Sequence, residues 1–263
     1  MSSPQIRFDD GASYEEFMGK WSRLAGNVFL DWLAPPPHLG WLDVGCGNGA
    51  FTELLVERCA PAAVEGIDPS EEQLAYARDH APAGARLSYR VGDAMSLPHA
   101  DASFDAAVMA LVIFFVPEPP RSVAEMARVV RPGGSVSTYA WDMFGAGFPF
   151  VAMQEEMEAL GFPRLWPPSA DASRMESLRA LWTGAGLVDV ETRAITIERS
   201  FADFETFWRI VQTGPRIAPL IAKMTPDVLA RLEARMRERL PADAQGRVTC
   251  GARANAVKGR VPT

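Results

Sequence analysis

The chain has 263 residues, of which 48% are hydrophobic and 22% are charged, and its formal net charge at pH 7 is −7. This length and composition are typical of a folded protein with a substantial core, and they exclude a disordered or collagen-like chain. The acidic balance argues against a protein that binds nucleic acid through a basic face.

No apolar run approaches the roughly 20 residues that a membrane-spanning helix needs. The first residues also lack the basic segment followed by an apolar stretch that marks a secretory signal, so we expect a cytoplasmic protein. Arginine far outnumbers lysine, which is typical of a GC-rich bacterial gene. The three cysteines (Cys46, Cys59 and Cys250) are scattered, which argues against a zinc cluster and against structural disulfides.

An amphipathic helix is expected around residues 13–33, and three prolines then separate it from the rest of the chain. Between residues 41 and 141, short apolar segments alternate with helical segments, which is typical of a parallel α/β sheet. The expected strands are 41–44, 63–67, 87–91, 104–111 and 134–141, and the expected helices are 50–59, 70–80 and 120–130. The segment 131–134 (RPGG) should end the third of these helices and turn the chain into the fifth strand.

The pattern changes after Trp141, where glycine, proline and aromatic residues become frequent. Helices are expected near 150–160, at 173–185 and in proline-broken pieces over 201–240, with strands at 187–197 and 246–258. A strand, a helical insertion and a closing strand predict a hairpin at the sheet edge that carries a helical cap.

The most informative segment is WLDVGCGNGA at residues 41–50, where an apolar strand leads into three alternating glycines (Gly45, Gly47 and Gly49) and then into a helix. Glycines allow backbone conformations that other residues avoid, and they let a ligand approach the main chain closely. The segment also matches the dinucleotide pattern G-x-G-x-x-G/A, so the glycines by themselves leave the cofactor open.

Three acidic residues narrow the choice, because each lies at the end of a successive strand. Asp43 lies two residues before the first glycine, where it would repel a pyrophosphate and hold a cationic amino group. Asp68 ends the second strand, where a carboxylate can accept hydrogen bonds from ribose hydroxyls. Asp93 ends the third, where an adenine amino group could donate to it. The combination favours an adenosyl ligand with a cationic end.

These motifs resemble the class I S-adenosylmethionine-dependent methyltransferases. The nearest likeness is to the small-molecule branch related to the ubiquinone and menaquinone biosynthesis enzymes (methyltransferase type 11). The matching segments are LDVGCGNGAF (42–51), GIDPSEEQLAYAR (66–78), GDAMSLP (92–98), FDAAVMALVIFFVPEP (104–119) and EMARVVRPGGSVS (125–137).

The resemblance implies a Rossmann-like, doubly wound α/β fold. Its seven-stranded sheet would be mostly parallel with an antiparallel last strand, and an N-terminal helix and helical cap insertions would surround it. We expect an N-terminal helical lid (1–37), an S-adenosylmethionine-binding core (38–142) and a sheet edge with a cap (143–263). The cap segments 143–172 and 201–240 would cover the substrate site within the same overall domain.

The resemblance also implies that S-adenosylmethionine lies across the ends of the first four strands. The glycine turn would meet its methionine part, Asp68 its ribose, and Asp93 its adenine edge, while Ala110 and Leu111 would lie beside the sulfonium. Relatives commonly have a bulkier hydrophobic residue where Gln73 stands. The complete expected set is Trp21, Asp43, Gly45, Cys46, Gly47, Gly49, Asp68, Pro69, Gln73, Asp93, Ala94, Met95, Ala110 and Leu111.

Methyl transfer from a sulfonium depends on alignment and a water-poor site, and it needs a general base only for a protonated acceptor. His38, His80 and His99 are more typical of solvated loop or surface histidines, so no catalytic base is assigned. No metal-binding constellation is apparent, and we expect S-adenosylmethionine to act without a metal and to leave as S-adenosylhomocysteine.

Aromatic and methionine residues gather in the expected cap, where they could line an apolar substrate pocket or hold the cap to the sheet. The candidate substrate-binding residues are Tyr14, Phe115, Trp141, Phe148, Trp208 and Arg209. Arg209 and Arg216 could pair with a substrate carboxylate or face solvent.

The sequence therefore predicts in-line methyl transfer to an oxygen, nitrogen or carbon atom of a small molecule, by a monomer or homodimer. An NAD(P)-dependent oxidoreductase would share the glycine turn, but Asp43 counts against it. A nucleic-acid methyltransferase usually has a polar motif such as Asn-Pro-Pro-Tyr where this chain has ALVI (110–113). A non-catalytic protein that binds the cofactor stays open.

Overall fold

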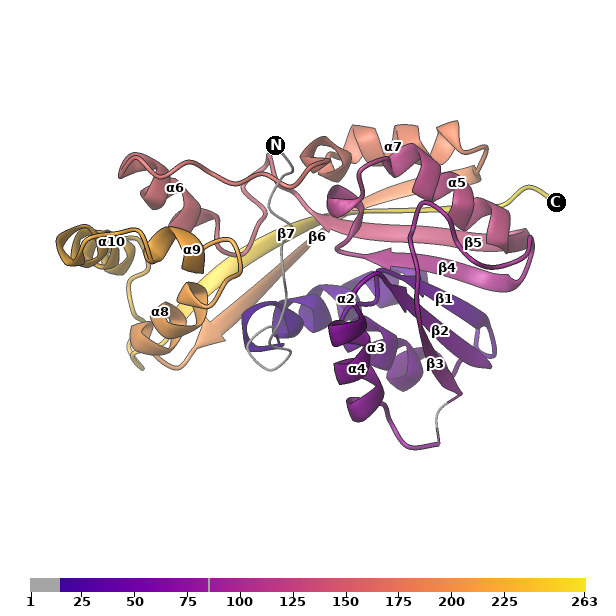
Figure 1. Cartoon of the computed structure of the whole chain (residues 1–263), viewed down its shortest axis with the longest axis horizontal. Helices are drawn as coiled ribbons and strands as arrows, with labels where there is room; N and C mark the ends of the chain where they lie inside the picture. The colour runs from indigo at the N-terminus through magenta and orange to yellow at the C-terminus, as the bar shows by residue number, and fades with distance from the viewer. Residues whose placement is uncertain (1–14, 85) are drawn as a thin grey trace.

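The computed structural model describes residues 15–84 and 86–263. Within them, one seven-stranded sheet has the order β3-β2-β1-β4-β5-β7-β6 (Figure 1). The strands that pair in parallel are β1 (Gly40–Val44), β2 (Ala63–Asp68), β3 (Leu87–Val91), β4 (Phe104–Ala110) and β5 (Val130–Trp141). The last strand, β7 (Val248–Arg260), runs antiparallel to both β5 and β6 (Val188–Phe201). The predicted Rossmann-like fold is confirmed, and the strand order reverses between β1 and β4, where ligands bind in such folds.

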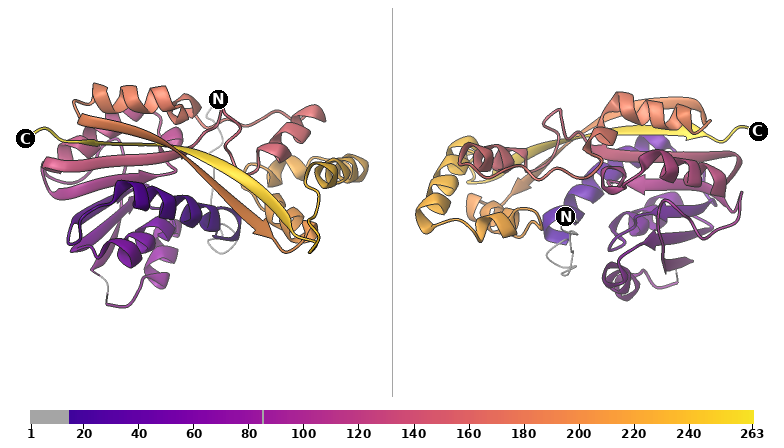
Figure 2. Two further views of the ribbon diagram at one scale, coloured as in Figure 1. Left: turned by 180° about the vertical axis from the view of Figure 1, so that it is seen from behind. Right: turned by 45° about the horizontal axis from the view of Figure 1, so that its top comes forward.

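Helices cover both faces of the sheet, so the fold is doubly wound (Figure 1, Figure 2). One face carries α2 (Lys20–Leu33), α3 (Ala50–Cys59) and α4 (Glu71–His80), and the other carries α5 (Pro119–Val129) and α7 (Met175–Gly184). Residues 13–14 of the expected first helix lie outside the described residues, and its next turn, η1 (Glu15–Gly19), is a π-helix. None of the described helices combines the length and the apolar character needed to cross a membrane.

Local sequence signals set the ends of the core helices. The Ser70 side chain accepts a hydrogen bond from the Gln73 N–H at 3.3 Å and caps α4. The paired prolines at 119–120 occupy the first turn of α5, where a missing N–H costs little.

The expected turn at residues 131–134 is instead part of β5, which begins at Val130 directly after α5. Val130 pairs with Phe104, and the next pair is Ser135 with Ala106, so the strand bulges at this point. The neighbouring chain end holds the bulge, because the Gly133 N–H donates to the Val261 carbonyl at 2.8 Å. The segment is a bulged strand and not a turn because of this long-range pairing, which no local signal in the segment reveals.

The strands β6 and β7 extend beyond the rest of the sheet. β5 pairs with β7 only as far as Trp141 and Ala254, and beyond that point β6 and β7 continue as a pair, residues 196–201 with residues 248–253. This two-stranded ribbon carries α8 (Phe204–Gln212), α9 (Ala218–Ile221) and α10 (Pro226–Arg239), and α6 (Val151–Ala159) packs against α10 (Figure 1). We call α6, α8, α9, α10 and their connecting loops the cap.

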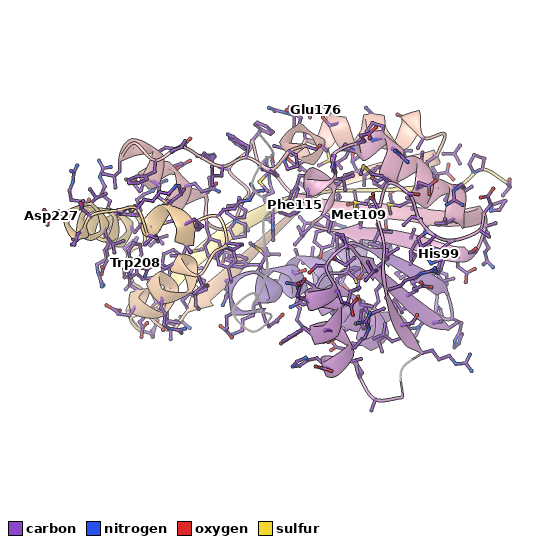
Figure 3. The ribbon with its side chains drawn as sticks, viewed as in Figure 1. His99, Met109, Phe115, Glu176, Trp208 and Asp227 are labelled. Carbon is purple, nitrogen blue, oxygen red and sulfur yellow. The ribbon has the colours of Figure 1, made fainter. Side chains whose placement is uncertain are left out.

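An aromatic cluster joins the cap to the core. Phe17 of η1 stacks on Phe150, with ring centroids 4.6 Å apart, and Trp21 meets the same ring edge-on at 6.1 Å. Phe115 lies where the core meets the cap, whereas Trp208 lies within the cap (Figure 3). Burial of such large apolar side chains holds the two parts of the molecule together.

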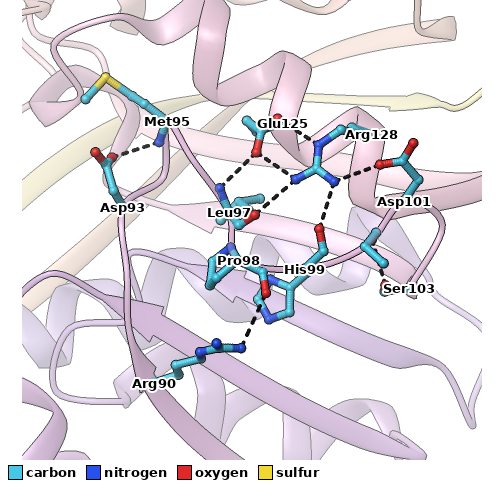
Figure 4. A network of polar contacts seen from close by, with 11 residues as sticks. Arg90, Asp93, Met95, Leu97, Pro98, His99, Asp101, Ser103, Glu125 and Arg128 are labelled. Atoms are coloured by element: carbon cyan, nitrogen blue, oxygen red, sulfur yellow. Dashed lines mark hydrogen bonds and ion pairs between the residues drawn. The ribbon is translucent and has the colours of Figure 1, made fainter.

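A clamp on α5 fixes the loop that follows β3 (Figure 4). The Arg128 guanidinium binds the Glu125 carboxylate at 2.8 Å, the carbonyl of His99 at 2.8 Å and that of Leu97 at 3.0 Å. It also reaches the Asp101 carboxylate at 2.8 Å. Glu125 in turn accepts the Leu97 N–H at 2.8 Å. The clamp therefore binds both a backbone N–H donor and backbone carbonyl acceptors of the loop.

Replacing Arg128 by methionine should lower the free energy of unfolding by about 2 kcal/mol, because hydrogen bonds to charged groups contribute roughly 1.5–3 kcal/mol. Urea unfolding of the purified variant measures the change. The matched control is Arg121→Met on the same helix, since Arg121 is exposed and has only a 4.0 Å contact with Glu118. Its expected effect is within about 0.5 kcal/mol of zero. Equal effects of the two substitutions would contradict the clamp.

Candidate functional site

The glycine turn connects β1 to α3 at the carboxyl edge of the sheet. Gly45, Gly47 and Gly49 have φ angles of +77°, +53° and +87°, a region that favours glycine. A Cβ atom at Gly45 would lie 2.6 Å from the Val112 side chain, and one at Gly49 would lie 2.6 Å from the Tyr89 hydroxyl. At Gly47 the nearest atom would be 4.0 Å away. Packing therefore explains the first and third glycines, whereas Gly47 presents its backbone to open space.

The Asp68 carboxylate holds this turn in place from the end of β2. One of its oxygens accepts the Gly47 N–H at 3.0 Å, and the other accepts the Ser70 N–H at 2.9 Å. Burial raises the pKa of Asp68, and these two backbone hydrogen bonds oppose that shift. Because each carboxylate oxygen has two acceptor positions, both oxygens keep capacity for a further donor such as a ribose hydroxyl.

Asp43 lies beneath the turn and is fully buried in β1. The Thr52 hydroxyl of α3 donates to one carboxylate oxygen at 2.7 Å, and the other has no hydrogen-bond partner among the described residues. Burial raises the pKa of Asp43 to about 7, and the hydrogen bond from Thr52 only partly opposes this shift. The structure shows Asp43 tying the turn to α3, and its contact with a cofactor amino group stays a prediction.

Further residues of the expected cofactor-binding set lie at the ends of the two neighbouring strands, β2 and β3. Gln73 is buried in the first turn of α4, while Pro69 is exposed just before it. Asp93 is exposed after β3, and its side chain accepts the Met95 N–H at 2.8 Å. Ala94 and Met95 are half-buried. The parallel pairing of β2 with β3 thus brings these residues to one edge, as the sequence predicted.

At the end of β4, Ala110 is half-buried and Leu111 is buried with a φ angle of +61°. The Leu111 N–H donates to the Tyr139 carbonyl of β5 at 2.8 Å, which holds this unusual backbone conformation. A non-glycine residue in the left-handed region costs about 1–2 kcal/mol, and such strain gathers at ligand sites. Cys46 is buried in the glycine turn, and Val112 packs directly against Gly45.

A cavity opens beside Leu111, between the sheet edge and the cap, and we call it the aromatic cavity. Its empty space, counted together with the open solvent at its mouth, is about 740 Å³. Its walls come from η1, the ends of β4 and β5, and the loops of the cap. Among its lining side chains are Phe17, Leu111, Phe115, Trp141, Phe148 and Trp166.

Three of the predicted substrate-binding residues, Phe115, Trp141 and Phe148, line the aromatic cavity. Trp208 and Arg209 do not line it: Trp208 stacks on Phe204 with centroids 5.9 Å apart, and Arg209 is exposed on α8. Tyr14 lies outside the described residues.

Trp21, predicted to fold over the cofactor, lies wholly buried in the cluster that joins core and cap and does not line the aromatic cavity. Its Nε1 has no hydrogen-bond partner among the described residues.

Sequence reasoning missed the parts of the cavity wall that come from η1 and from the loop after α6. Phe17 and Met18 lie one helical turn before Trp21, so the same amphipathic pattern could have identified them. Arg164 and Pro167 belong to an irregular loop with no periodicity, and no signal in the sequence points to them.

The lining of the aromatic cavity, among the described residues, has two ionisable side chains, and both are arginines (Arg164 and Arg216). His99 lies elsewhere, with its Nε2 2.9 Å from the Glu65 carboxylate, and His80 stacks on Tyr76. The described part of the lining therefore offers no general base to an acceptor bound there. In residues 15–84 and 86–263, no three histidine, cysteine or acidic side chains are grouped to hold a metal ion.

Substituting Asp43 by asparagine should change how stability depends on pH. An aspartate has a pKa near 3.9 in the unfolded chain and about 7 here, so between these values the folded state binds more protons than the unfolded state. Asp43 therefore makes the wild type less stable as the pH rises through this window.

An asparagine side chain cannot ionise, so the variant lacks this loss of stability. The unfolding free energy of Asp43→Asn minus that of the wild type should therefore rise by on the order of 3 kcal/mol between about pH 4.5 and pH 8. Urea unfolding across this pH range provides the measurement. Parallel stability curves for the two proteins would show that Asp43 is ionised at low pH.

Comparison with known proteins identifies a family whose members share the core of this sheet. A family model described as a methyltransferase domain matches residues 42–138. The ubiquinone/menaquinone biosynthesis C-methyltransferase of Paracoccus denitrificans is 39% identical over 115 residues, which are 43% of this chain and 46% of that protein. The match thus spans about half the length of this curated relative.

A solved structure of phosphoethanolamine N-methyltransferase 2 from Haemonchus contortus contains phosphomonomethylethanolamine and S-adenosylhomocysteine. It superposes with a TM-score of 0.57 at 19% identity, and the alignment covers 96% of this chain and 57% of that one. This likeness shows a shared fold.

The likeness to one relative extends over nearly the whole chain. The trans-aconitate 2-methyltransferase of Methylobacterium nodulans is 30% identical over 248 residues, which cover 91% of this chain and 93% of that protein. Together with the family match over the core of the sheet, this full-length similarity shows that the chain belongs to the class I S-adenosylmethionine-dependent methyltransferases.

Proposed function

We propose that this methyltransferase acts on a small-molecule acceptor bound in the aromatic cavity, next to a cofactor held by the glycine turn. The observation that carries the proposal is the position of the cavity. Leu111 lines it, while the adjacent Val112 packs against Gly45 of the turn. A ligand on the turn and a second ligand in the cavity would therefore be neighbours.

The residues around the turn fit S-adenosylmethionine. Gly47 leaves open space in front of its backbone, and Asp68 keeps free acceptor positions at the end of β2. Gln73 lies beside Gly47, and Asp93 follows the neighbouring strand. In this proposal Asp68 holds the ribose and Asp93 faces the adenine amino group. When bound, the cofactor supplies an electrophilic methyl group on a sulfonium.

The protein contributes position and a dry environment rather than proton chemistry. The rings of Phe115, Trp141 and Phe148 give the cavity an apolar lining, and an in-line displacement gains most from orientation and proximity. Because the lining residues that the structure describes include no general base, we expect the accepting atom to be nucleophilic without giving a proton to the wall. The relatives named above for ubiquinone/menaquinone biosynthesis and for trans-aconitate support a small-molecule acceptor.

Calorimetric titration with S-adenosylhomocysteine, and with NADH in a parallel cell, tests the cofactor assignment. Micromolar binding of the first ligand and none of the second is expected. Incubation with methyl-labelled S-adenosylmethionine and a panel of small molecules then tests transfer. Cofactor binding without transfer to any acceptor would favour a non-catalytic binding protein.

Replacing Gly47 by alanine should weaken S-adenosylhomocysteine binding roughly tenfold or more, since the added methyl group occupies the space through which a ligand approaches the backbone. The same titration measures the affinity.

The matched control is Gly186→Ala in the turn before β6, because Gly186 also has a positive φ angle (+78°) and no atom lies within 4 Å of where its Cβ would be. Both substitutions should reduce stability by about 1 kcal/mol from backbone strain alone. If Gly47→Ala binds the ligand as tightly as Gly186→Ala does, the turn is not the cofactor site.

A further inference from the structure

Arg216, in the loop between α8 and α9, brings a positive charge to the wall of the aromatic cavity. Its Nη1 donates to the Leu165 carbonyl at 2.6 Å, and its guanidinium lies 5.3 Å from the centre of the Phe115 ring. Among the described residues, no carboxylate forms an ion pair with it. Burial lowers the pKa of Arg216 to about 10, which still leaves it charged at neutral pH.

The second arginine of the wall differs in one respect. Arg164 donates from Nη2 to the Glu158 carboxylate at 2.8 Å, and it lies 5.1 Å from the centre of the Trp166 ring. Its charge is therefore neutralised within the protein. The wall consequently carries one positive charge, that of Arg216, without a counterion among the described residues.

We propose that Arg216 binds the carboxylate of the methyl acceptor, and that the acceptor is a monocarboxylate with an apolar body. This inference rests on the function proposed above and names its substrate class. A guanidinium presents five N–H donors in a planar fork that matches a carboxylate, and the structure shows only one bond of that fork in use.

The single charge selects against other acceptors of similar size. Among the described lining residues a protonated amine would meet two arginines and no acidic side chain, although aromatic rings alone would attract a cation. A tricarboxylate such as trans-aconitate would have two carboxylates left without a partner against an apolar wall, which is unfavourable. A monocarboxylate places its charge on Arg216 and its hydrocarbon part on the rings of Phe115 and Trp166.

Arg216 and the proposed cofactor site belong to different parts of the fold. Arg216 comes from the cap, whereas Leu111 lies at the sheet edge beside the proposed cofactor site. Arg216 is therefore a binding and positioning residue, and the identity of the accepting atom is a separate question.

Binding of matched ligands tests the charge preference directly. With S-adenosylhomocysteine present, calorimetry or the fluorescence of Trp141 and Trp166 would report binding of octanoate, octanol and octylamine. The series cinnamate, cinnamyl alcohol and cinnamylamine repeats the test with an aromatic body, and trans-aconitate is the tricarboxylate. In at least one series the acid should bind roughly tenfold tighter than its alcohol, with the amine and trans-aconitate weaker still.

Variants assign the preference to Arg216. Arg216→Met should weaken binding of the preferred acid roughly tenfold to a hundredfold and leave its alcohol unchanged, while Arg216→Lys should keep part of the preference. The control is Arg193→Met, which removes an exposed arginine of β6 that lies outside the cavity lining. Unchanged S-adenosylhomocysteine affinity and melting temperature would show that the variants are folded.

The outcomes separate this inference from the proposed function. Alcohols or amines that bind as well as the acids in both series, or an acid affinity that Arg216→Met leaves intact, would overturn the inference even if methyl transfer occurs. Preferential binding of trans-aconitate would overturn the restriction to one carboxylate. Acid binding that depends on Arg216, without methyl transfer to any acceptor of the panel, would instead support a carboxylate site at Arg216 and contradict the proposed methyl transfer.

Discussion

The site depends on one carboxylate that joins two strands. Asp68, at the end of β2, accepts backbone N–H groups from Gly47 of the neighbouring turn and from Ser70 at the start of α4. These bonds fix the path of the glycine turn and the start of α4 at the same time. Asp43 acts from below, where it accepts the Thr52 hydroxyl inside the core. Two acidic residues thus hold the glycine turn and the helices that follow it, Asp68 from the end of β2 and Asp43 from within β1.

A second constraint comes from the ribbon of β6 and β7, which extends past the sheet and carries the cap. Phe150 connects the two parts, because it contacts Phe17 and Trp21 of the N-terminal helices as well as Phe207 of α8. The aromatic cavity lies next to this junction, so its shape depends on how the cap packs on the core. A movement of α8 or η1 would therefore change the cavity before it changed the glycine turn.

Sequence reasoning succeeded where the determinants are local. The strands and helices between residues 41 and 141 carry their own periodicity, caps and prolines, and their predicted ends agree with the structure except at the bulge after Val130. It failed where long-range packing decides. In α8, burial of Phe207 and Ile210 directs Arg209 to solvent, and composition alone cannot reveal which face of the helix is buried. Arg216 was left open between a substrate and solvent, because its neighbours Leu165 and Phe115 are distant in sequence.

The charges of the two parts of the site are complementary to different chemical groups. Two carboxylates, Asp43 and Asp68, lie at the glycine turn, whereas the cavity lining, as far as the structure describes it, has two arginines and no acid. A cationic sulfonium ligand therefore suits the first part and an anionic acceptor the second. Attraction between the two ligands would then favour their approach in a medium of low dielectric constant. A wall without a general base is sufficient for such a pair, because an acceptor that is already nucleophilic needs alignment and desolvation rather than removal of a proton.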